Sequence, residues 1–224
     1  MKNKLQAKLE EDALLMEVIE DVKNEQLQQI WNKYGLAIII SVALILTAAI
    51  SFESLKSWYH KKQQELSNAY SIALSLQNQG RLDESIDVYK TLVEKASGIY
   101  VDLARLQIAD IYFRESKNED AIQVLQLLIS DNSATKQIRD IAAIKLAAYK
   151  LDNNGSADDV KALLLPLISG DNISNVANEL LAMLYIRENN IQQAIDEYKK
   201  ISLSSTASDI LKNRSLDMIN ILEQ

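Results

Sequence analysis

A run of eighteen residues, 35–52, most constrains how this chain can fold, because it contains no charge and no proline. Its only polar side chains are Ser41, Thr47 and Ser51. At a helical rise of about 1.5 Å per residue, the run would extend roughly 27 Å, close to the hydrocarbon thickness of a lipid bilayer. We therefore expect a transmembrane helix over residues 35–54.

Aromatic residues stand at both ends of this run: Trp31 and Tyr34 precede it, and Trp58 and Tyr59 follow it. Both residue types are enriched where a membrane meets water, because an apolar ring with a polar tip suits the headgroup region. Along one helix, Trp31 and Trp58 would lie about 40 Å apart, which matches a bilayer with its interfaces. We interpret the four side chains as membrane-interface anchors. The alternative is a buried helix of a soluble domain, in which both aromatic pairs would be coincidental.

The leader, residues 1–34, carries five lysines against seven acidic residues. A signal peptide begins with a short basic region, so the acidic leader indicates that the span is retained; cleavage near residues 49–51 is the alternative. Apolar residues recur within the leader at mostly helical spacing, beside an acidic face. This pattern predicts either a solvated helix that continues into the span or a docking helix for a basic partner. Lysines near the span favour a cytoplasmic C-terminal domain by one residue, which is too small a difference to set the orientation.

Composition excludes several classes of function. The chain has no cysteine, and its one histidine, His60, lies beside the predicted membrane surface, so a thiol nucleophile, a thiolate metal site and a nucleophile with a histidine partner are all excluded. The sequence contains no glycine-rich phosphate loop. Its net charge of −7 is opposite in sign to that of a protein that binds nucleic acid. We therefore expect no catalysis, no cofactor, no metal ion and no nucleic acid.

An internal period begins near residue 66, and one proline and five glycines in the whole chain indicate helices throughout. The repeats align on small or β-branched residues, where a second helix would cross the first, at separations of 36, 39 and 34 residues: Ser85, Ala121, Val160 and Ala194. An alanine stands twelve residues before each: Ala73, Ala109, Ala148 and Ala182. Small residues let antiparallel helices approach closely, so the period predicts four helix hairpins.

Bulky residues and residues that favour turns also recur at corresponding positions of the four repeats. A bulky residue follows each crossing position by four: Tyr89, Leu125, Leu164 and Tyr198. Shortly before each crossing position stands a candidate turn residue: Gly80, Lys117, Gly155 and Asn189. Pro166 falls within the second helix of the third hairpin, where it would kink or end that helix. A closing helix over about residues 208–223 would cover the open edge of the last hairpin.

This alternation of small and bulky residues resembles the tetratricopeptide repeat. The resemblance is degenerate, because the usual early tryptophan is absent and the proline that ends each repeat is replaced by Ser97, Ser133, Asn172 and Thr206. It implies an all-α fold, with one transmembrane helix followed by an α-solenoid of about four hairpins and a capping helix. The expected parts are an acidic amphipathic segment, a transmembrane helix, a juxtamembrane linker helix and a repeat domain, over residues 1–34, 35–54, 55–65 and 66–224.

The whole layout also resembles a narrower group. An acidic leader, the sequence QLQQIWNKYG at residues 26–35, a single span, the pair Trp58 and Tyr59, and degenerate repeats are similar to the bacterial family of ancillary Sec translocon subunits. This resemblance implies a protein of the bacterial inner (cytoplasmic) membrane, with a cytoplasmic N-terminus and a periplasmic repeat domain. It also implies translocon subunits, a periplasmic chaperone or unfolded chains as partners, and no reaction.

Carrying the repeat geometry onto this sequence places one face of the first helices along a concave groove. The face mixes apolar, aromatic and charged side chains, which suits an extended or partly unfolded polypeptide. The predicted protein-binding residues are Tyr70, Leu74, Gln77, Leu106, Asp110, Phe113, Arg114, Lys145, Tyr149, Asp152, Glu179, Met183, Ile186 and Arg187. In a tighter superhelix, individual members of this set would be core side chains instead.

Two other functions fit the same features. The first is a scaffold that forms homo-oligomers through its repeats or its span and organises an envelope assembly, such as division or secretion machinery. The second is an adaptor with inverted topology, whose repeats face the cytoplasm. Both alternatives keep protein binding as the task and differ in the partner or the compartment.

Overall fold

The computed structural model describes residues 31–37, 39–41, 44, 47, 53, 56–169 and 172–224. The chain divides into two compact units, Met1–Gln63 and Gln64–Gln224. In the first unit, residues 31–37 and 56–63 are helical. Much of the predicted transmembrane helix, at residues 38, 42–43, 45–46, 48–52 and 54, lies outside the described residues, as does the leader up to residue 30. Within the described residues, no helix combines the length and the apolar character that crossing a membrane requires.

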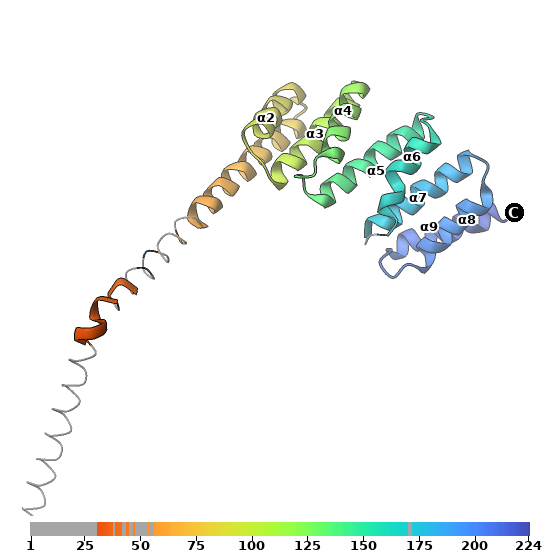
Figure 1. Cartoon of the computed structure of the whole chain (residues 1–224). Coiled ribbons are helices and arrows are strands. Elements are labelled where there is room, and N and C mark those ends of the chain that lie inside the picture. The colour runs from red at the N-terminus through yellow and green to blue at the C-terminus, as the bar shows by residue number, and fades with distance from the viewer. Residues whose placement is uncertain are drawn as a thin grey trace, which may run out of the picture. The chain divides into compact units, whose positions relative to one another are not determined.

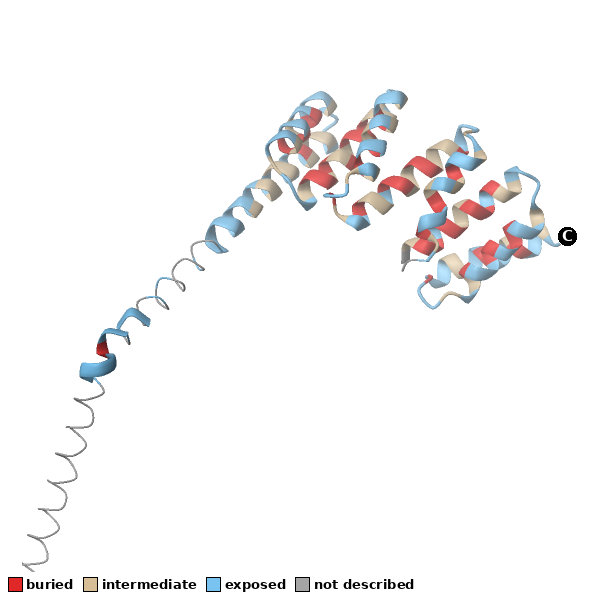
Figure 2. Cartoon of the chain, in the orientation of Figure 1, coloured by how far each residue is buried: buried red, intermediate tan, exposed pale blue. Residues whose placement is uncertain are grey.

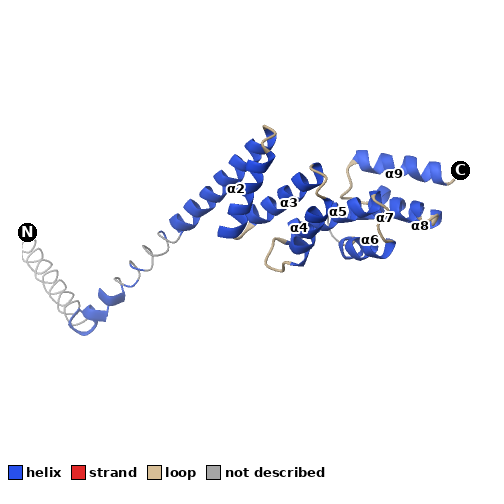
Figure 3. Ribbon diagram, turned by 90° about the horizontal axis from the view of Figure 1, so that it is seen from above, coloured by secondary structure: helices blue, strands red, loops and turns tan. Residues whose placement is uncertain are grey.

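The second unit is a series of antiparallel helix pairs, shown in Figure 1 and, from above, in Figure 3. Residues 64–78 are helical and precede α2. The helices that follow are α2 (Leu82–Lys95), α3 (Ile99–Arg114), α4 (Asn118–Ser130), α5 (Lys136–Asp152), α6 (Ala157–Leu164), α7 (Asn172–Arg187), α8 (Ile191–Leu203) and α9 (Asp209–Leu222). The all-α prediction of helical repeats is confirmed, and the described part of the chain contains no strand.

The residues at the predicted helix crossings are packed completely. Ser85, Ala121, Val160 and Ala194 are all fully buried. At the first crossing, the Ser85 hydroxyl donates a 2.7 Å hydrogen bond to the carbonyl oxygen of Ala73, twelve residues earlier in the paired helix. A larger side chain would hold the two backbones apart, so the small residue is what permits this bond.

Among the described residues, four hydrophobic clusters form the core of this unit, and each joins one hairpin to the helix that follows it. One cluster, for example, joins Leu106 and Ala109 of α3 to Leu125 and Leu128 of α4 and to Leu146 of α5. The last cluster is completed by Ile219 of the closing helix α9, which confirms the predicted capping role. Figure 2 shows buried residues gathered where the helices of this unit face one another. Such nearest-neighbour packing is the basis of a solenoid.

One turn motif recurs in all four hairpins. A residue with positive φ ends the first helix, at Gly80 (78°), Ser116 (61°), Asn154 (55°) and Asn189 (61°). The amide of the next residue reaches back five positions to a helix carbonyl, as from Arg81 to Leu76 at 3.0 Å. This is the Schellman arrangement, which satisfies carbonyls that the helix end leaves free. The predicted turn residues Gly80 and Asn189 are confirmed, whereas Lys117 and Gly155 each lie one position after the residue with positive φ.

The third hairpin departs from the others in two ways. Its turn, residues 153–156, is one residue longer than the three-residue turns of the other hairpins. The predicted alanine twelve residues before the crossing position is shifted as a consequence. The fully buried alanine is Ala147, and the prediction of Ala148 is wrong by one position. The second difference is at Pro166, which lies in a short 3₁₀ helix, Leu165–Leu167, directly after α6 ends at Leu164. Proline was expected to end or kink this helix, and it does so because its ring cannot fit a continuing α-helix.

Replacing Gly155 by alanine is expected to destabilise the repeat unit by about 1–3 kcal/mol, because the site is overpacked. An added Cβ would lie 2.9 Å from both the Cβ and the carbonyl oxygen of Lys150. The amide of Gly155 also donates to that carbonyl at 2.6 Å, so the backbone has little room to move. The measurement is urea unfolding followed by circular dichroism.

Gly80 provides the matched control, because a Cβ there would meet nothing within 4 Å although φ is 78°. Asparagine tolerates positive φ, so Gly80→Asn should restore most of the stability that Gly80→Ala loses. Gly155→Asn should be no better than Gly155→Ala. Equal recovery by asparagine at both positions would contradict the steric explanation for Gly155.

Candidate protein-binding surfaces

The fourteen predicted groove residues differ widely in exposure. Arg114, Asp152, Met183 and Arg187 are exposed. The half-buried members are Tyr70, Leu74, Gln77, Asp110, Phe113, Lys145, Tyr149, Glu179 and Ile186. The prediction of Leu106 as a surface residue is wrong: it is 6% exposed and belongs to the core cluster of α3, α4 and α5. Here we call the other thirteen the first-helix surface.

Polar and aromatic contacts join the first-helix surface across the first two hairpins. The ring of Tyr70 packs 5.6 Å from that of Tyr89 and 6.0 Å from that of Tyr100, measured between centroids. The amide of Gln107 donates to the Tyr70 hydroxyl at 3.4 Å, and the amide of Gln77 donates to the side-chain oxygen of Gln107 at 3.2 Å. These groups therefore satisfy one another within the chain.

Two side-chain pairs join α3 to α5. The ammonium group of Lys145 donates to both carboxylate oxygens of Asp110, at 2.8 and 3.1 Å. The rings of Phe113 and Tyr149 stack with centroids 4.6 Å apart and an interplanar angle of 28°. All four residues were predicted as parts of one surface, and the structure brings them together as two internal pairs. Both pairs stabilise the packing of neighbouring hairpins.

Charged residues of α7 make the same kind of contact further along the unit. The guanidinium group of Arg187 donates to the carbonyl of Leu151 at 3.2 Å and to that of Gly155 at 2.9 Å, so it caps the end of α5. Glu179 forms an ion pair with Arg214 of α9 at 2.6 Å. Many polar groups of the first-helix surface thus form hydrogen bonds or ion pairs with other residues of the chain. Met183, Arg114 and Asp152 remain exposed.

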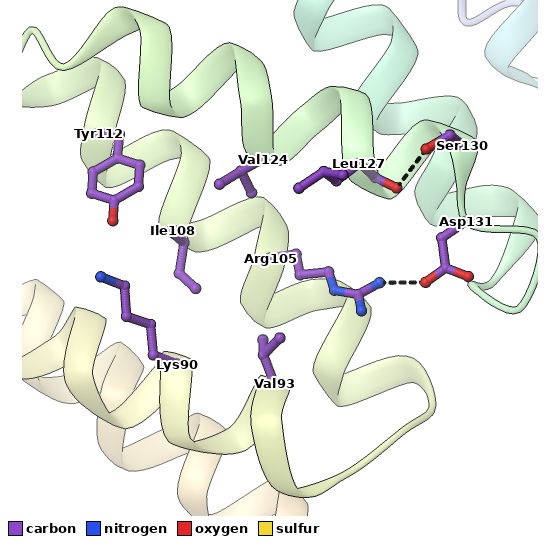
Figure 4. Close-up of a pocket in the computed structure, with 9 residues that line it drawn as sticks. All are labelled: Lys90, Val93, Arg105, Ile108, Tyr112, Val124, Leu127, Ser130 and Asp131. Atoms are coloured by element: carbon purple, nitrogen blue, oxygen red, sulfur yellow. Dashed lines mark hydrogen bonds and ion pairs between the residues drawn. The ribbon is translucent and has the colours of Figure 1, made fainter.

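A separate groove lies between α2 and α4, with α3 as its floor (Figure 4). Its volume is about 510 Å³. We call it the α3 groove, and the residues that line it are Lys90, Val93, Arg105, Ile108, Tyr112, Val124, Leu127, Ser130 and Asp131. None of them belongs to the predicted set.

The middle of the α3 groove is apolar and its two ends are polar. Leu127 of α4 is 62% exposed there, although its neighbour Leu128 has no exposed surface. At one end, the Lys90 ammonium nitrogen lies 5.8 Å from the centre of the Tyr112 ring. At the other end, Arg105 donates to Asp131 at 2.7 Å. Figure 4 shows Lys90 directed toward Tyr112, and the Arg105–Asp131 pair beyond the apolar side chains.

Asp131 is held as a carboxylate by several donors. The Ser133 hydroxyl donates at 2.6 Å, Arg105 at 2.7 Å and the Ser133 amide at 2.9 Å. These bonds hold the pKa of Asp131 well below its ordinary value of 3.8, because each favours the charged form. The loop after α4 is therefore fixed by an ionised side chain at neutral pH.

Asp131→Asn is expected to destabilise the repeat unit at neutral pH but to have little effect in strong acid. A carboxyl whose pKa is lowered by folding stabilises the folded state above its unfolded pKa of 3.8, and this contribution is lost as the pH falls below that value. Urea unfolding between about pH 7 and about pH 2 should show the two proteins converging on the acid side. A constant difference in stability across the whole range would contradict this account.

The sequence does carry a signal for the α3 groove. Residues 124–129 read VLQLLI, which places more apolar residues in one stretch of helix than a single buried face needs. Leu125 and Leu128 occupy the core face, and Leu127 is directed off it. The periodicity alone does not reveal that α2 and α3 complete a groove around this extra leucine, because that depends on how successive hairpins pack.

The chain is similar to a known protein family over almost its whole length. A family model described as a tetratricopeptide repeat-like domain matches residues 28–218. No curated protein matches the sequence. The matched residues include every helix from α2 to α8 and most of α9.

Proposed function

Because the chain belongs to the tetratricopeptide repeat-like domain family, we propose that it is a protein-binding module anchored in the bacterial inner membrane by one helix over residues 35–54. The observation that best supports protein binding is the α3 groove, an open depression of about 510 Å³ in which Leu127 is 62% exposed. Contiguous exposed apolar surface of this kind marks interaction sites. In this proposal, the repeats face the periplasm and the leader faces the cytoplasm.

Membrane anchoring is supported by the uncharged run over residues 35–52 and by its aromatic flanks. Trp31, Tyr34, Trp58 and Tyr59 are all exposed, so their rings are free to occupy the headgroup region. A carbonate wash should leave the full-length chain in the membrane pellet. Release of the chain by carbonate would contradict the anchoring, whatever its partner is.

The proposed partners are subunits of the Sec translocon, a periplasmic chaperone or emerging unfolded chains, in line with the resemblance of the whole layout. Tethering strengthens such a role, because confinement beside the target raises the effective concentration to about the millimolar range and lets weak contacts suffice. A reporter fused after Gln224 tests the orientation. Activity in the periplasm is expected, and activity only in the cytoplasm would establish the inverted adaptor instead.

Photo-crosslinking in cells tests the partners. A crosslinking amino acid at Leu127 probes the α3 groove, one at Met183 probes the first-helix surface, and one at Gln192 serves as an exposed control position. Adducts with translocon subunits, a chaperone or nascent chains from either surface, absent at the control, would support the proposal. Adducts only with copies of the chain would support a scaffold.

The scaffold is the second candidate, and the exposed face of α9 favours it. Ile210 is 80% exposed and Ile221 is 61% exposed, with Arg214 and Asp217 between them on the same side of the helix. If two copies of α9 pack antiparallel, Ile210 meets Ile221 of the other copy, while Arg214 keeps its 2.6 Å ion pair with Glu179 of its own chain. Such self-complementary pairing is what a two-fold interface requires.

Analytical ultracentrifugation of the full-length chain in mild detergent distinguishes the candidates. Under the scaffold hypothesis, Ile210→Glu should convert a dimer to a monomer, and an exposed leucine elsewhere provides the matched control, Leu203→Glu. A monomer in the unsubstituted chain would exclude self-association through α9.

A further inference from the structure

We infer that the α3 groove binds one amphipathic helix of a partner protein, with an apolar stripe on Leu127 and its neighbours and an acidic side chain paired with Lys90. This inference rests on the proposed function, because it specifies the kind of protein segment that the module takes. It assigns a site that the sequence did not predict.

The apolar middle of the groove comes from all three helices. Val93 of α2, Ile108 of α3, and Val124 and Leu127 of α4 line it. Most of the large apolar side chains of the neighbouring core have less than a tenth of their surface exposed, whereas Leu127 has 62% exposed. A partner that covers this leucine gains affinity, because the burial removes apolar surface from water. The partner must therefore present apolar side chains along a line between α2 and α4.

The backbone of the partner must satisfy its own hydrogen bonds over this middle section. Valine, isoleucine and leucine side chains offer neither donor nor acceptor, and the groups of the groove that can hydrogen-bond lie at its ends. An extended peptide would leave amide and carbonyl groups unpaired against apolar surface, which weakens its binding. A helix pairs those groups internally. The groove thus favours a helix with one apolar face over an extended chain.

The charges at the ends of the groove set the preferred side chains of the partner. Arg105 and Asp131 pair with each other, so that end is close to neutral. Lys90 forms no ion pair among the described residues and lies against the ring of Tyr112. A second cation, Lys117, lies 5.9 Å from the same ring but is already paired with Glu115. Among the residues that line the groove, Lys90 is therefore the cation without a carboxylate partner, and its charge is complementary to a glutamate or aspartate.

Three synthetic peptides test the inference against the full-length chain in nanodiscs of anionic lipid, with empty nanodiscs as the blank. The first peptide has about 18 residues, enough for about 27 Å of helix, with leucines at helical spacing and glutamates flanking them. The second has the same composition in an order that scatters the leucines around the helix. The third replaces the glutamates by lysines. Each carries a fluorescent label, and binding is measured by anisotropy.

The first peptide should bind, and the scattered peptide should bind at least about tenfold more weakly, because only one apolar face fits the groove. Leu127→Gln should weaken binding of the first peptide by about tenfold or more. Lys90→Glu should weaken it about fivefold and should strengthen binding of the lysine peptide, and both effects should shrink with added salt. Leu203→Gln, at a leucine that is 85% exposed outside the groove, should change nothing.

Several results would overturn the inference. Equal binding of the ordered and scattered peptides would indicate an extended or non-specific ligand. Unchanged binding by the Leu127 and Lys90 variants would place the peptide elsewhere, and a groove substitution that alters the oligomeric state would make a second copy the occupant. If these variants bind normally while crosslinking still recovers translocon subunits, the α3 groove assignment fails and the proposed function stands.

Discussion

Leu128→Ala is expected to lower the free energy of unfolding of the repeat unit by about 3 kcal/mol, within a range of about 2–5 kcal/mol. Leu128 has no exposed surface and packs in the cluster that joins α3, α4 and α5. Truncation removes apolar atoms from the core and leaves a cavity, since the side chains of α3 and α5 in the same cluster relax only partly around it. Urea unfolding followed by far-ultraviolet circular dichroism measures the loss.

Leu127→Ala is the control for this substitution, because it makes the same chemical change one position earlier in the same helix. With 62% of Leu127 exposed, the expected change in stability is within about 0.5 kcal/mol. Native-state hydrogen exchange should show that the Leu128 variant loses protection first in α3, α4 and α5. Equal destabilisation by the two substitutions would mean that Leu127 is covered within the folded chain, and the α3 groove would then be closed.

Tyr89→Ala is expected to be still more damaging, at about 3–5 kcal/mol, because it removes a whole aromatic ring from the core. Tyr89 has no exposed surface and lies against the ring of Tyr70. Its hydroxyl donates to the side-chain oxygen of Gln77 at 3.3 Å. Tyr89→Phe keeps the ring and loses this one bond, so it should cost only about 0.5–1.5 kcal/mol. A large loss from the phenylalanine variant would contradict the view that the ring carries the stability.

Alkaline pH should unfold the chain partly through the same residue. Burial raises the pKa of Tyr89 above its ordinary value of 10.0, and the neighbouring Tyr70 adds to the rise. A group whose pKa is raised by folding stabilises the folded state fully below its unfolded pKa, and this contribution is lost as the pH rises above 10.0. Thermal unfolding of the Tyr89→Phe variant should therefore depend less on pH above about 10 than that of the unsubstituted chain. Identical slopes would contradict this.

Much of the repeat architecture could be predicted from the sequence because close helix crossings tolerate few residue types. Ser85, Ala121, Val160 and Ala194 had to be small or β-branched, and all four are fully buried. The closing helix was predictable for a related reason: an apolar helix after the last hairpin covers an edge that water would otherwise reach. These features depend on contacts within one hairpin or between adjacent ones, which a regular period reflects.

The candidate surfaces were less predictable, since they depend on which side chains pair across hairpins. Periodicity placed Asp110 and Lys145 on the first helices but did not indicate that they neutralise each other. It placed Leu106 on the surface by analogy with its neighbours, although α4 and α5 bury it. In the third hairpin, the longer turn shifts the buried alanine by one position, and no local signal distinguishes Ala147 from Ala148.

Helix α9 is a terminal cap that closes the array of helix hairpins. Each internal cluster is built from a hairpin and the first helix of its successor, and in the last cluster α9 occupies the place of that successor. A further hairpin inserted between α8 and α9 would meet the same apolar edge that α9 meets now. Duplication of a hairpin at this junction would therefore lengthen the array, and α9 would still cap its end.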